Sequence, residues 1–214
     1  METLEKLNPK SIYMDEINFE KFVNIPRENI SVFDTNILIS SVIPKESRNI
    51  NEFLKCQQHA YGKKRGFLMK KSIIYHKRGM KIVDAIEEGL LIDAGICPVI
   101  TNNVYAELRN FEKKAGTENI KQWLRKNKEN VCNAFMPTEY YRKKYPVISE
   151  ILKENGDFSV AVASVELGCN IATDDYRSFD NSTLNRIKKE QKKKWPRATF
   201  VRHDSESLAM LLGI

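Results

Sequence analysis

The stretch GDFSVAVASVELGCNIATDD, residues 156–175, decides the fold. It begins with a turn signal, and Asp157 is a candidate N-cap for the apolar helix that follows. We expect this helix to end at Gly168, and the apolar run at residues 169–173 predicts a buried strand. The stretch therefore predicts a buried helix followed by a strand, with acidic residues before and after the pair.

The same alternation of helical and extended segments continues on both sides of this stretch. We expect strands at residues 31–34, 96–101, 130–136, 169–173 and 199–203. We expect helices at residues 35–43, 49–61, 80–95, 103–116, 119–128, 140–155 with a break near Pro146, 159–168, 178–194 and 205–213, while residues 72–76 fit a strand. Thr101 or Asn102 and Asp204 or Ser205 are the expected N-caps. Strands that alternate with helices predict an α/β protein with three α/β/α layers and a central, mainly parallel sheet.

The domain organisation follows from length and composition. A chain of 214 residues suits one domain, and it contains no internal repeat or low-complexity linker. Residues 1–30 are weakly periodic and are expected to form an N-terminal extension. Residues 31–214 form the predicted main domain, with an insertion at about residues 45–96 that contains a basic helical segment.

The composition indicates a cytoplasmic protein. The N-terminal residues lack the apolar core of a secretory signal, and no apolar run is long enough to span a bilayer. The four cysteines are scattered, and reduced thiols explain them best. Cys56 and His59 form half of a zinc pattern, but no second half follows at a suitable spacing.

Positive charge is concentrated in two segments. The net charge is +7, from 35 Lys and Arg against 28 Asp and Glu, which favours a polyanionic partner. In the first segment, residues 61–81, aromatic residues interleave the cations, a pattern typical of nucleic-acid contact. Its candidate nucleic-acid-binding residues are Lys63, Lys64, Arg65, Lys70, Lys71, Lys77 and Arg78. The second segment, residues 188–197, ends a predicted helix, where positive charge is favourable in any case.

Four carboxylates lie where apolar segments give way to turns or helices: Asp34, Glu107, Asp157 and Asp175. In a parallel α/β sheet, ligands bind beyond the carboxyl ends of the strands. Two carboxylates about 4 Å apart repel by roughly 4 kcal/mol at an effective dielectric constant of 20, so a cluster of four requires protons or a cation. Carboxylate and water ligands suit Mg²⁺ or Mn²⁺, which would activate water for attack on a phosphodiester.

These residues resemble the PIN-domain nuclease family over roughly residues 31–212. The segment 156–175 is similar to the family's aspartate, alanine-rich helix, glycine, strand and T-x-D motif. FDTNIL at 33–38, NNVYAELRNF at 102–111 and TFVRHDSESLAMLL at 199–212 resemble its first strand end, glutamate-bearing helix and closing strand and helix. The resemblance implies a PIN-like fold in which Asp34, Glu107, Asp157 and Asp175 are catalytic and bind the metal. It further implies that Asp174 assists the metal and that Thr35, Asn36 and Thr173 support it.

Two features depart from the family pattern. TDDYRSF at residues 173–179 is one residue longer than T-x-D-x-D-F and has Ser178 before Phe179. The choice among Asp174, Asp175 and Asp180 for the last acidic position therefore stays open. The interval from Asp34 to Glu107 is about twice that of compact family members, and the excess falls on the basic segment.

The leading hypothesis is a metal-dependent endoribonuclease in which basic residues hold the RNA. RNA is favoured over DNA by the resemblance alone. A structure-specific DNA nuclease and a catalytically silent RNA-binding scaffold are the alternatives. His76 and His203 lack triad-like partners, which argues against a serine or cysteine hydrolase. We expect no membrane partner, and the sequence leaves a homodimer and an inhibitory protein partner open.

Overall fold

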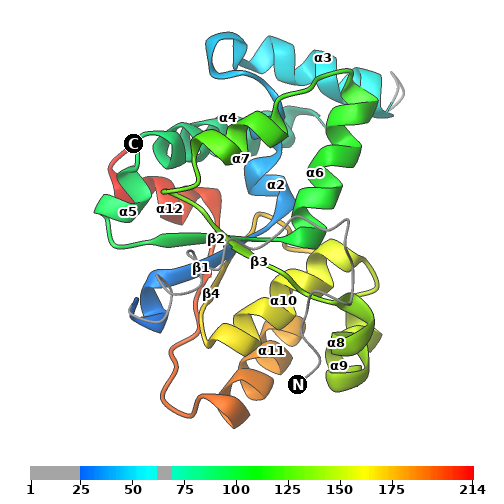
Figure 1. The fold of residues 1–214 in the computed structure, drawn as a ribbon, viewed down its shortest axis with the longest axis vertical. Coiled ribbons are helices and arrows are strands. Elements are labelled where there is room, and N and C mark those ends of the chain that lie inside the picture. The colour runs from blue at the N-terminus through cyan, green and yellow to red at the C-terminus, as the bar shows by residue number, and fades with distance from the viewer. Residues whose placement is uncertain (1–24, 62–68) are drawn as a thin grey trace.

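The computed structural model describes the backbone of residues 25–61 and 69–214, and the side chains of residues 25–60 and 76–214. The expected N-terminal extension lies outside the described residues up to position 24, and the rest of it contains a short 3₁₀ helix at Arg27–Asn29. Lys63, Lys64 and Arg65 also lie outside the described residues. The α/β class predicted from the sequence is confirmed, as Figure 1 shows.

The described strands form one five-stranded, all-parallel sheet in the order β3-β2-β1-β4-β5. In the central strand, Val32 lies opposite Val99 on one neighbour and Ile171 on the other. All five expected strands are present; β1 is shifted by one residue from the expected range, and the other four are shorter than their apolar segments. Their bounds are β1 (Ile30–Phe33), β2 (Cys97–Thr101), β3 (Cys132–Ala134), β4 (Asn170–Ala172) and β5 (Arg202–His203).

The helix α10 (Asn155–Leu167) lies across one face of this sheet and is in contact with β1, β2 and β4. Residues 158–165 of this helix are all buried, on every side. A helix that is apolar all round must be enclosed, and α6, α8, α9 and α11 cover the side of α10 that does not face the sheet. Their bounds are α6 (Asn102–Ala115), α8 (Thr138–Lys144), α9 (Pro146–Ile151) and α11 (Asn181–Lys194).

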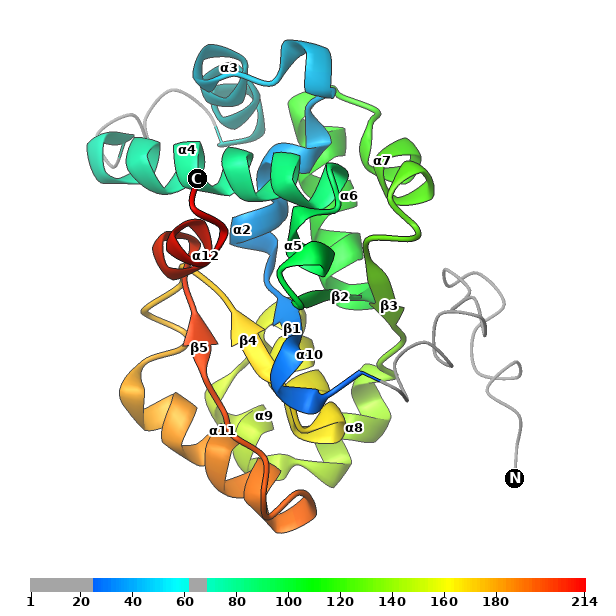
Figure 2. The ribbon, with the colours of Figure 1, turned by 90° about the vertical axis from the view of Figure 1, so that its left-hand side faces the viewer.

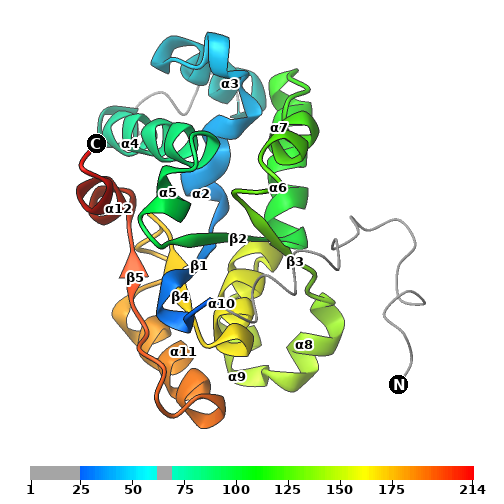
Figure 3. The same cartoon turned by 60° about the vertical axis from the view of Figure 1, so that its left-hand side comes forward.

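The other face of the sheet is covered by a second group of helices, as Figures 1 and 3 show. This group contains α4 (Met69–Glu87), α5 (Leu90–Asp93) and α12 (Ser205–Leu212), and α5 and α12 contact β2 and β5. Because both faces are covered, β1, β2 and β4 are buried throughout, as continuous apolar strands of a parallel sheet require. The arrangement is consistent with three α/β/α layers. The remaining helices are α2 (Thr35–Leu38), α3 (Ile50–Tyr61), α7 (Ile120–Lys126) and the 3₁₀ helices Ile39–Val42 and Lys45–Ser47.

Two predictions for the insertion are wrong. Residues 72–76 belong to α4 and not to a strand, because this helix begins at Met69. The single helix expected at residues 80–95 is divided at Gly89, whose φ of 76° is left-handed and ends α4 before α5 starts.

Most predicted helix ends are confirmed. Thr101 caps α6 through a hydrogen bond that its hydroxyl accepts from the Val104 N–H, and left-handed Gly116 ends the same helix. Gly168 ends α10 in the same conformation. Asp204 caps α12 in a capping box with Ser207.

The insertion packs on the segment that follows β1. The helix α4 contacts α2 and α12, which follow β1 and β5, and Figure 2 shows it above both of them. A Cβ atom at Gly79 would lie 3.1 Å from the backbone oxygen of Ile37. The lack of a side chain at Gly79 therefore sets how closely α4 approaches α2.

We expect Gly79→Val to destabilise the protein by about 1–3 kcal/mol, because the added methyl groups force α4 away from the backbone of α2. Chemical denaturation measures the effect. Lys81→Val places the same β-branched residue at an exposed position of α4 and is expected to cost about 0.5 kcal/mol. Equal losses in the two variants would contradict close packing at Gly79.

Candidate functional site

The order of the strands places the first candidate aspartate at a switch point. From β1 the chain continues to β2 on one side, and β4 later pairs with β1 on the other side. In open α/β sheets this point, at the carboxyl ends of the strands, is where ligands bind. Asp34 directly follows β1, and Thr173 directly follows β4.

The carboxylate of Asp34 is buried, with 2% of the residue exposed. Its Oδ1 accepts a hydrogen bond from the Thr35 N–H at 2.6 Å. Its Oδ2 accepts hydrogen bonds from the Asn36 amide and the Thr173 hydroxyl, both at 2.7 Å. The three predicted supporting residues, Thr35, Asn36 and Thr173, are thus brought to Asp34.

Asn36 connects the two strand ends a second time. Its Oδ1 accepts a hydrogen bond from the Asp174 N–H at 3.0 Å, while its Nδ2 donates to Asp34. Asn36 therefore fixes the loop after β4 with respect to the loop after β1.

Glu107 reaches the same region from α6. Its Oε2 accepts a hydrogen bond from the Thr35 hydroxyl at 2.6 Å, and its Oε1 accepts one from the Gly156 N–H at 3.0 Å. Burial raises the pKa of Glu107, against the effect of these two hydrogen bonds. Glu107 thus lies close to Asp34 and to the start of α10. The resemblance and its position on the helix had both predicted it for the site.

Gly156 is the one residue of this region that sequence reasoning treated only as a turn signal. A Cβ atom built at this position would lie 2.1 Å from Oε1 of Glu107. Because no side chain fits there, Gly156 lets the glutamate carboxylate rest against the backbone of α10. The sequence signal was the glycine itself, next to Asp157; only the structure shows that it lies within α10, where glycine costs about 1 kcal/mol relative to alanine.

We expected Asp157 to be the N-cap of α10, and this prediction is wrong. The helix begins at Asn155, and Glu154 occupies the cap position without a side-chain hydrogen bond. Asn155 and Gly156 take up helical geometry, so Asp157 lies in the first turn, where an acidic side chain also interacts favourably with the helix dipole.

The acids influence one another electrostatically. Burial raises the pKa of Asp34 to about 7, and the charges of Asp157 and Glu107 add to this increase. Burial likewise raises the pKa of Asp157 to about 6, with further contributions from Asp175 and Glu107 and an opposing hydrogen bond from Ser178. Asp34, Glu107, Asp157 and Asp175 therefore form one electrostatically coupled group, which we call the acidic group.

The structure separates the three candidates for the last acidic position. Oδ1 of Asp174 accepts a hydrogen bond from the Ser205 N–H at 2.8 Å, so Asp174 holds the start of α12. Asp180 caps α11 through the Thr183 N–H at 2.7 Å. Asp175 is the candidate whose charge acts on Asp157.

The Asp175 carboxylate also organises its own loop. Oδ1 accepts hydrogen bonds from the N–H groups of Arg177 and Ser178, and Oδ2 accepts one from the Ser178 hydroxyl at 2.9 Å. Ser178, which occupies the position where the family pattern has an acid, therefore holds the Asp175 carboxylate, and its hydroxyl also counteracts the rise in the pKa of Asp157.

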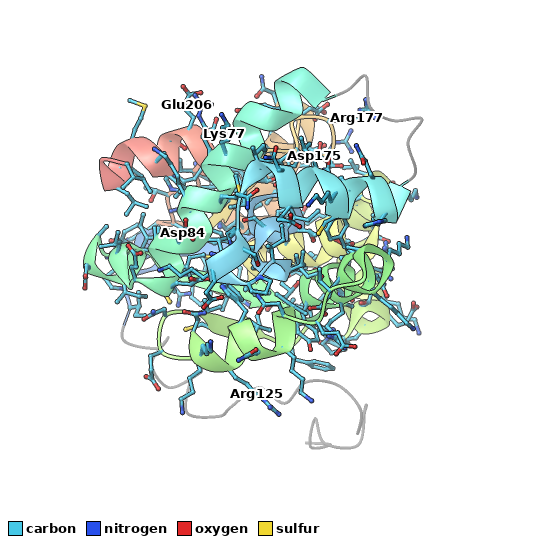
Figure 4. The ribbon with its side chains drawn as sticks, turned by 90° about the horizontal axis from the view of Figure 1, so that it is seen from above. Lys77, Asp84, Arg125, Asp175, Arg177 and Glu206 are labelled. Atoms are coloured by element: carbon cyan, nitrogen blue, oxygen red, sulfur yellow. The ribbon has the colours of Figure 1, made fainter. Side chains whose placement is uncertain are left out.

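The described basic candidates differ in their roles. Arg78 forms two hydrogen bonds with the carboxylate of Glu206, at 3.0 and 3.1 Å, and joins α4 to α12. Lys77 is exposed, and in the view of Figure 4 it lies on the same side of the molecule as Asp175 and Arg177. Of Lys70 and Lys71 the structure describes only the helical backbone.

The carboxylates of the acidic group suit a hard divalent cation, but their side chains are not arranged around a common metal position. Carboxylate oxygens are the ligands that Mg²⁺ or Mn²⁺ prefers. Neighbouring acids raise the pKa values of Asp34 and Asp157, and a bound cation would favour the charged form of both groups. Within residues 25–60 and 76–214, however, no three His, Cys, Asp or Glu side chains are placed so that they could hold a metal ion. The oxygens are instead occupied by the hydroxyl and amide hydrogen bonds described above.

We expect Asp34 to lower the free energy of unfolding as the pH rises from about 4 to about 7. Folding raises the pKa of Asp34 from 3.8 to about 7, so this residue binds more protons in the folded protein than in the unfolded chain over this range. Burial of His76 and His203 lowers their pKa values and acts in the opposite direction, so the quantity to measure is the difference between the wild type and Asp34→Asn. Denaturant titrations of both proteins at several pH values in EDTA should show the stability of the wild type falling relative to that of Asp34→Asn, and a difference that is constant across this range would contradict the raised pKa of Asp34.

Comparisons with known proteins found no matching family model, no matching curated protein and no matching solved structure. No helix in the described part of the chain has the length and apolar character needed to cross a membrane.

Proposed function

We propose that the protein is a PIN-like, divalent-metal-dependent endoribonuclease that hydrolyses phosphodiester bonds at the acidic group. The observation that carries this proposal is the burial of Asp34 at the switch point, with a pKa of about 7 that neighbouring acids raise further. A buried carboxylate with a strongly raised pKa is typical of a functional site, and neighbouring acids favour a role in binding a cation.

The proposal gives the acidic group one role and the surrounding residues others. Asp34, Glu107, Asp157 and Asp175 would hold Mg²⁺ or Mn²⁺, once Asp157 and Asp175 turn away from Ser178. The bound ion would supply an activated water and would stabilise the charge of the phosphodiester transition state. Thr35, Asn36 and Thr173 keep Asp34 and Glu107 in place through their hydrogen bonds. Asp174 supports α12 and contributes through the position of its loop.

The raised pKa values connect cation binding with pH. At neutral pH the acidic group retains part of its protons, because Asp34 has a pKa of about 7 and Asp157 one of about 6. A cation must displace these protons, so its affinity increases with pH in this range.

A catalytically silent RNA-binding scaffold is the second candidate. It is favoured by the absence, among the described side chains, of three acids arranged to hold a metal ion, and by the use of both Asp175 oxygens within its own loop. A structure-specific DNA nuclease would use the same acidic group, and parallel assays on RNA and DNA substrates separate it from an endoribonuclease.

We expect Asp34→Asn to abolish Mn²⁺-dependent cleavage of single-stranded RNA while the protein stays folded, because the central carboxylate loses its charge. The measurement is cleavage of a labelled RNA, with flap and duplex DNA in parallel. Asp93→Asn removes an exposed acid from α5 and is expected to retain activity. Full activity in Asp34→Asn would refute the proposal.

Metal binding can be tested without activity. We expect Mn²⁺ to raise the melting temperature of the wild-type protein, because the ion binds only the folded state. Gly156→Ala, which forces Glu107 out of its position, should reduce this shift although no acid is changed. Gly116→Ala is the control, since a Cβ there meets no atom within 4 Å and only the strain of its positive φ is added. A wild-type melting temperature that does not respond to Mn²⁺ would support the scaffold.

A further inference from the structure

The helix α11 presents a strongly basic surface to solvent. Arg186, Lys188, Lys189 and Lys192 are all exposed. We call these four side chains the outer α11 face. Figures 1 and 2 show α11 at the periphery of the molecule, on the far side of α10 from the sheet.

The opposite side of α11 is firmly attached to the domain. Ile187 and Gln191 are buried, and the Gln191 amide donates hydrogen bonds to the backbone oxygens of Ser164 at 3.0 Å and Cys169 at 2.8 Å. Trp195 donates from its indole nitrogen to the Val165 oxygen at 3.1 Å. These contacts fix the rotation of α11 about its axis, so the outer α11 face must point away from the protein.

The charges of this face are not neutralised within the domain. Lys193 pairs with Glu190, and Lys194 pairs with Glu166. The four side chains of the outer α11 face, by contrast, have no ion-pair partner among residues with described side chains. Lys188 and Lys192 lie one helical turn apart, and like charges at this spacing destabilise a helix by about 0.2–0.5 kcal/mol.

The helix dipole accounts for only part of this charge. Lys192, Lys193 and Lys194 lie in the last turn, where cations are favourable, but the effect does not extend beyond that turn. Arg186, Lys188 and Lys189 lie earlier in the helix and gain nothing from it. Their concentration therefore indicates a partner outside the domain.

We propose that the outer α11 face binds the phosphate backbone of single-stranded RNA. The four cations are unpaired within the described part of the chain, and Glu190, the one acidic residue of α11, is already paired with Lys193, so the face matches a chain of phosphates. A membrane surface fits less well, because a helix that lies in a bilayer interface exposes apolar side chains, and the exposed residues of α11 are all polar or charged.

The position of the face relates it to the acidic group. The helix begins directly after Asp180, at the end of the loop that contains Asp175, and Lys188 lies seven residues beyond the first helical residue, or about 10 Å along the axis. An RNA strand extending from the acidic group by a few nucleotides would reach it. The choice of RNA as ligand rests on the proposed function, whereas the unpaired charge of the face does not.

The test is the affinity for a fluorescein-labelled single-stranded RNA, measured by anisotropy in EDTA over a series of salt concentrations. Replacing Lys188, Lys189 and Lys192 together by Gln should weaken binding roughly tenfold at low salt and reduce the salt dependence by about 2 in log–log slope. Replacing the same three residues by Arg should retain binding. Circular dichroism and the melting temperature establish that both variants are folded.

A matched control removes the same charge elsewhere. Lys113, Lys114 and Lys121 are exposed on α6 and α7, and replacing them by Gln should leave affinity within about twofold of the wild type. Equal weakening in the two triple variants, or no change in the α11 variant, would overturn the proposal. So would a loss of binding to anionic phospholipid vesicles in the α11 variant with RNA affinity unchanged. Since EDTA prevents cleavage, RNA binding through α11 by a protein that never cleaves RNA would refute the proposed function alone.

Discussion

The hydrogen bond that the Thr173 hydroxyl donates to the Asp34 carboxylate is the constraint on which the site depends. It joins the end of β1 to the end of β4, two neighbouring strands whose bonded residues are 139 positions apart in the chain. Asn36 repeats the connection by binding Asp34 through its amide nitrogen and the Asp174 N–H through its oxygen. A buried carboxylate is costly, and these donors reduce the cost without removing it, because the pKa of Asp34 is still raised to about 7.

The free-energy cost of burying charge is increased by the electrostatic repulsion between the acids. Glu107 and Asp157 reach Asp34 from α6 and α10, and each negative charge makes the next one less favourable. Hydroxyl and amide hydrogen bonds are made to carboxylate oxygens of Asp34, Glu107 and Asp175, and the described side chains offer no set of three placed to hold an ion. The acidic group is therefore strained electrostatically, and the proposed cation would relieve that strain.

The two basic regions differ in how the fold uses them. In α4, Arg78 is paired with Glu206 and serves the contact between α4 and α12. In α11, Lys193 and Lys194 pair with Glu190 and Glu166, while the cations of the outer α11 face are left to solvent. The second basic segment, which helix electrostatics seemed to explain from the sequence, thus carries unpaired cations among the residues with described side chains.

Apolar periodicity was enough to predict the α/β class and the five strands, because burial on both faces of a parallel sheet leaves continuous apolar runs. Most helix ends were predictable from single residues, since Thr101, Gly116 and Gly168 act locally. The tertiary structure decided what depends on distant partners. It placed Asp157 in the first turn of α10 and not at its cap, and it divided the 80–95 helix at Gly89. It assigned Asp174 to α12 and left Asp175 coupled to Asp157. Sequence could not distinguish these neighbours, because the partners that separate them, Ser205 and Ser178, acquire their positions only when the chain has folded.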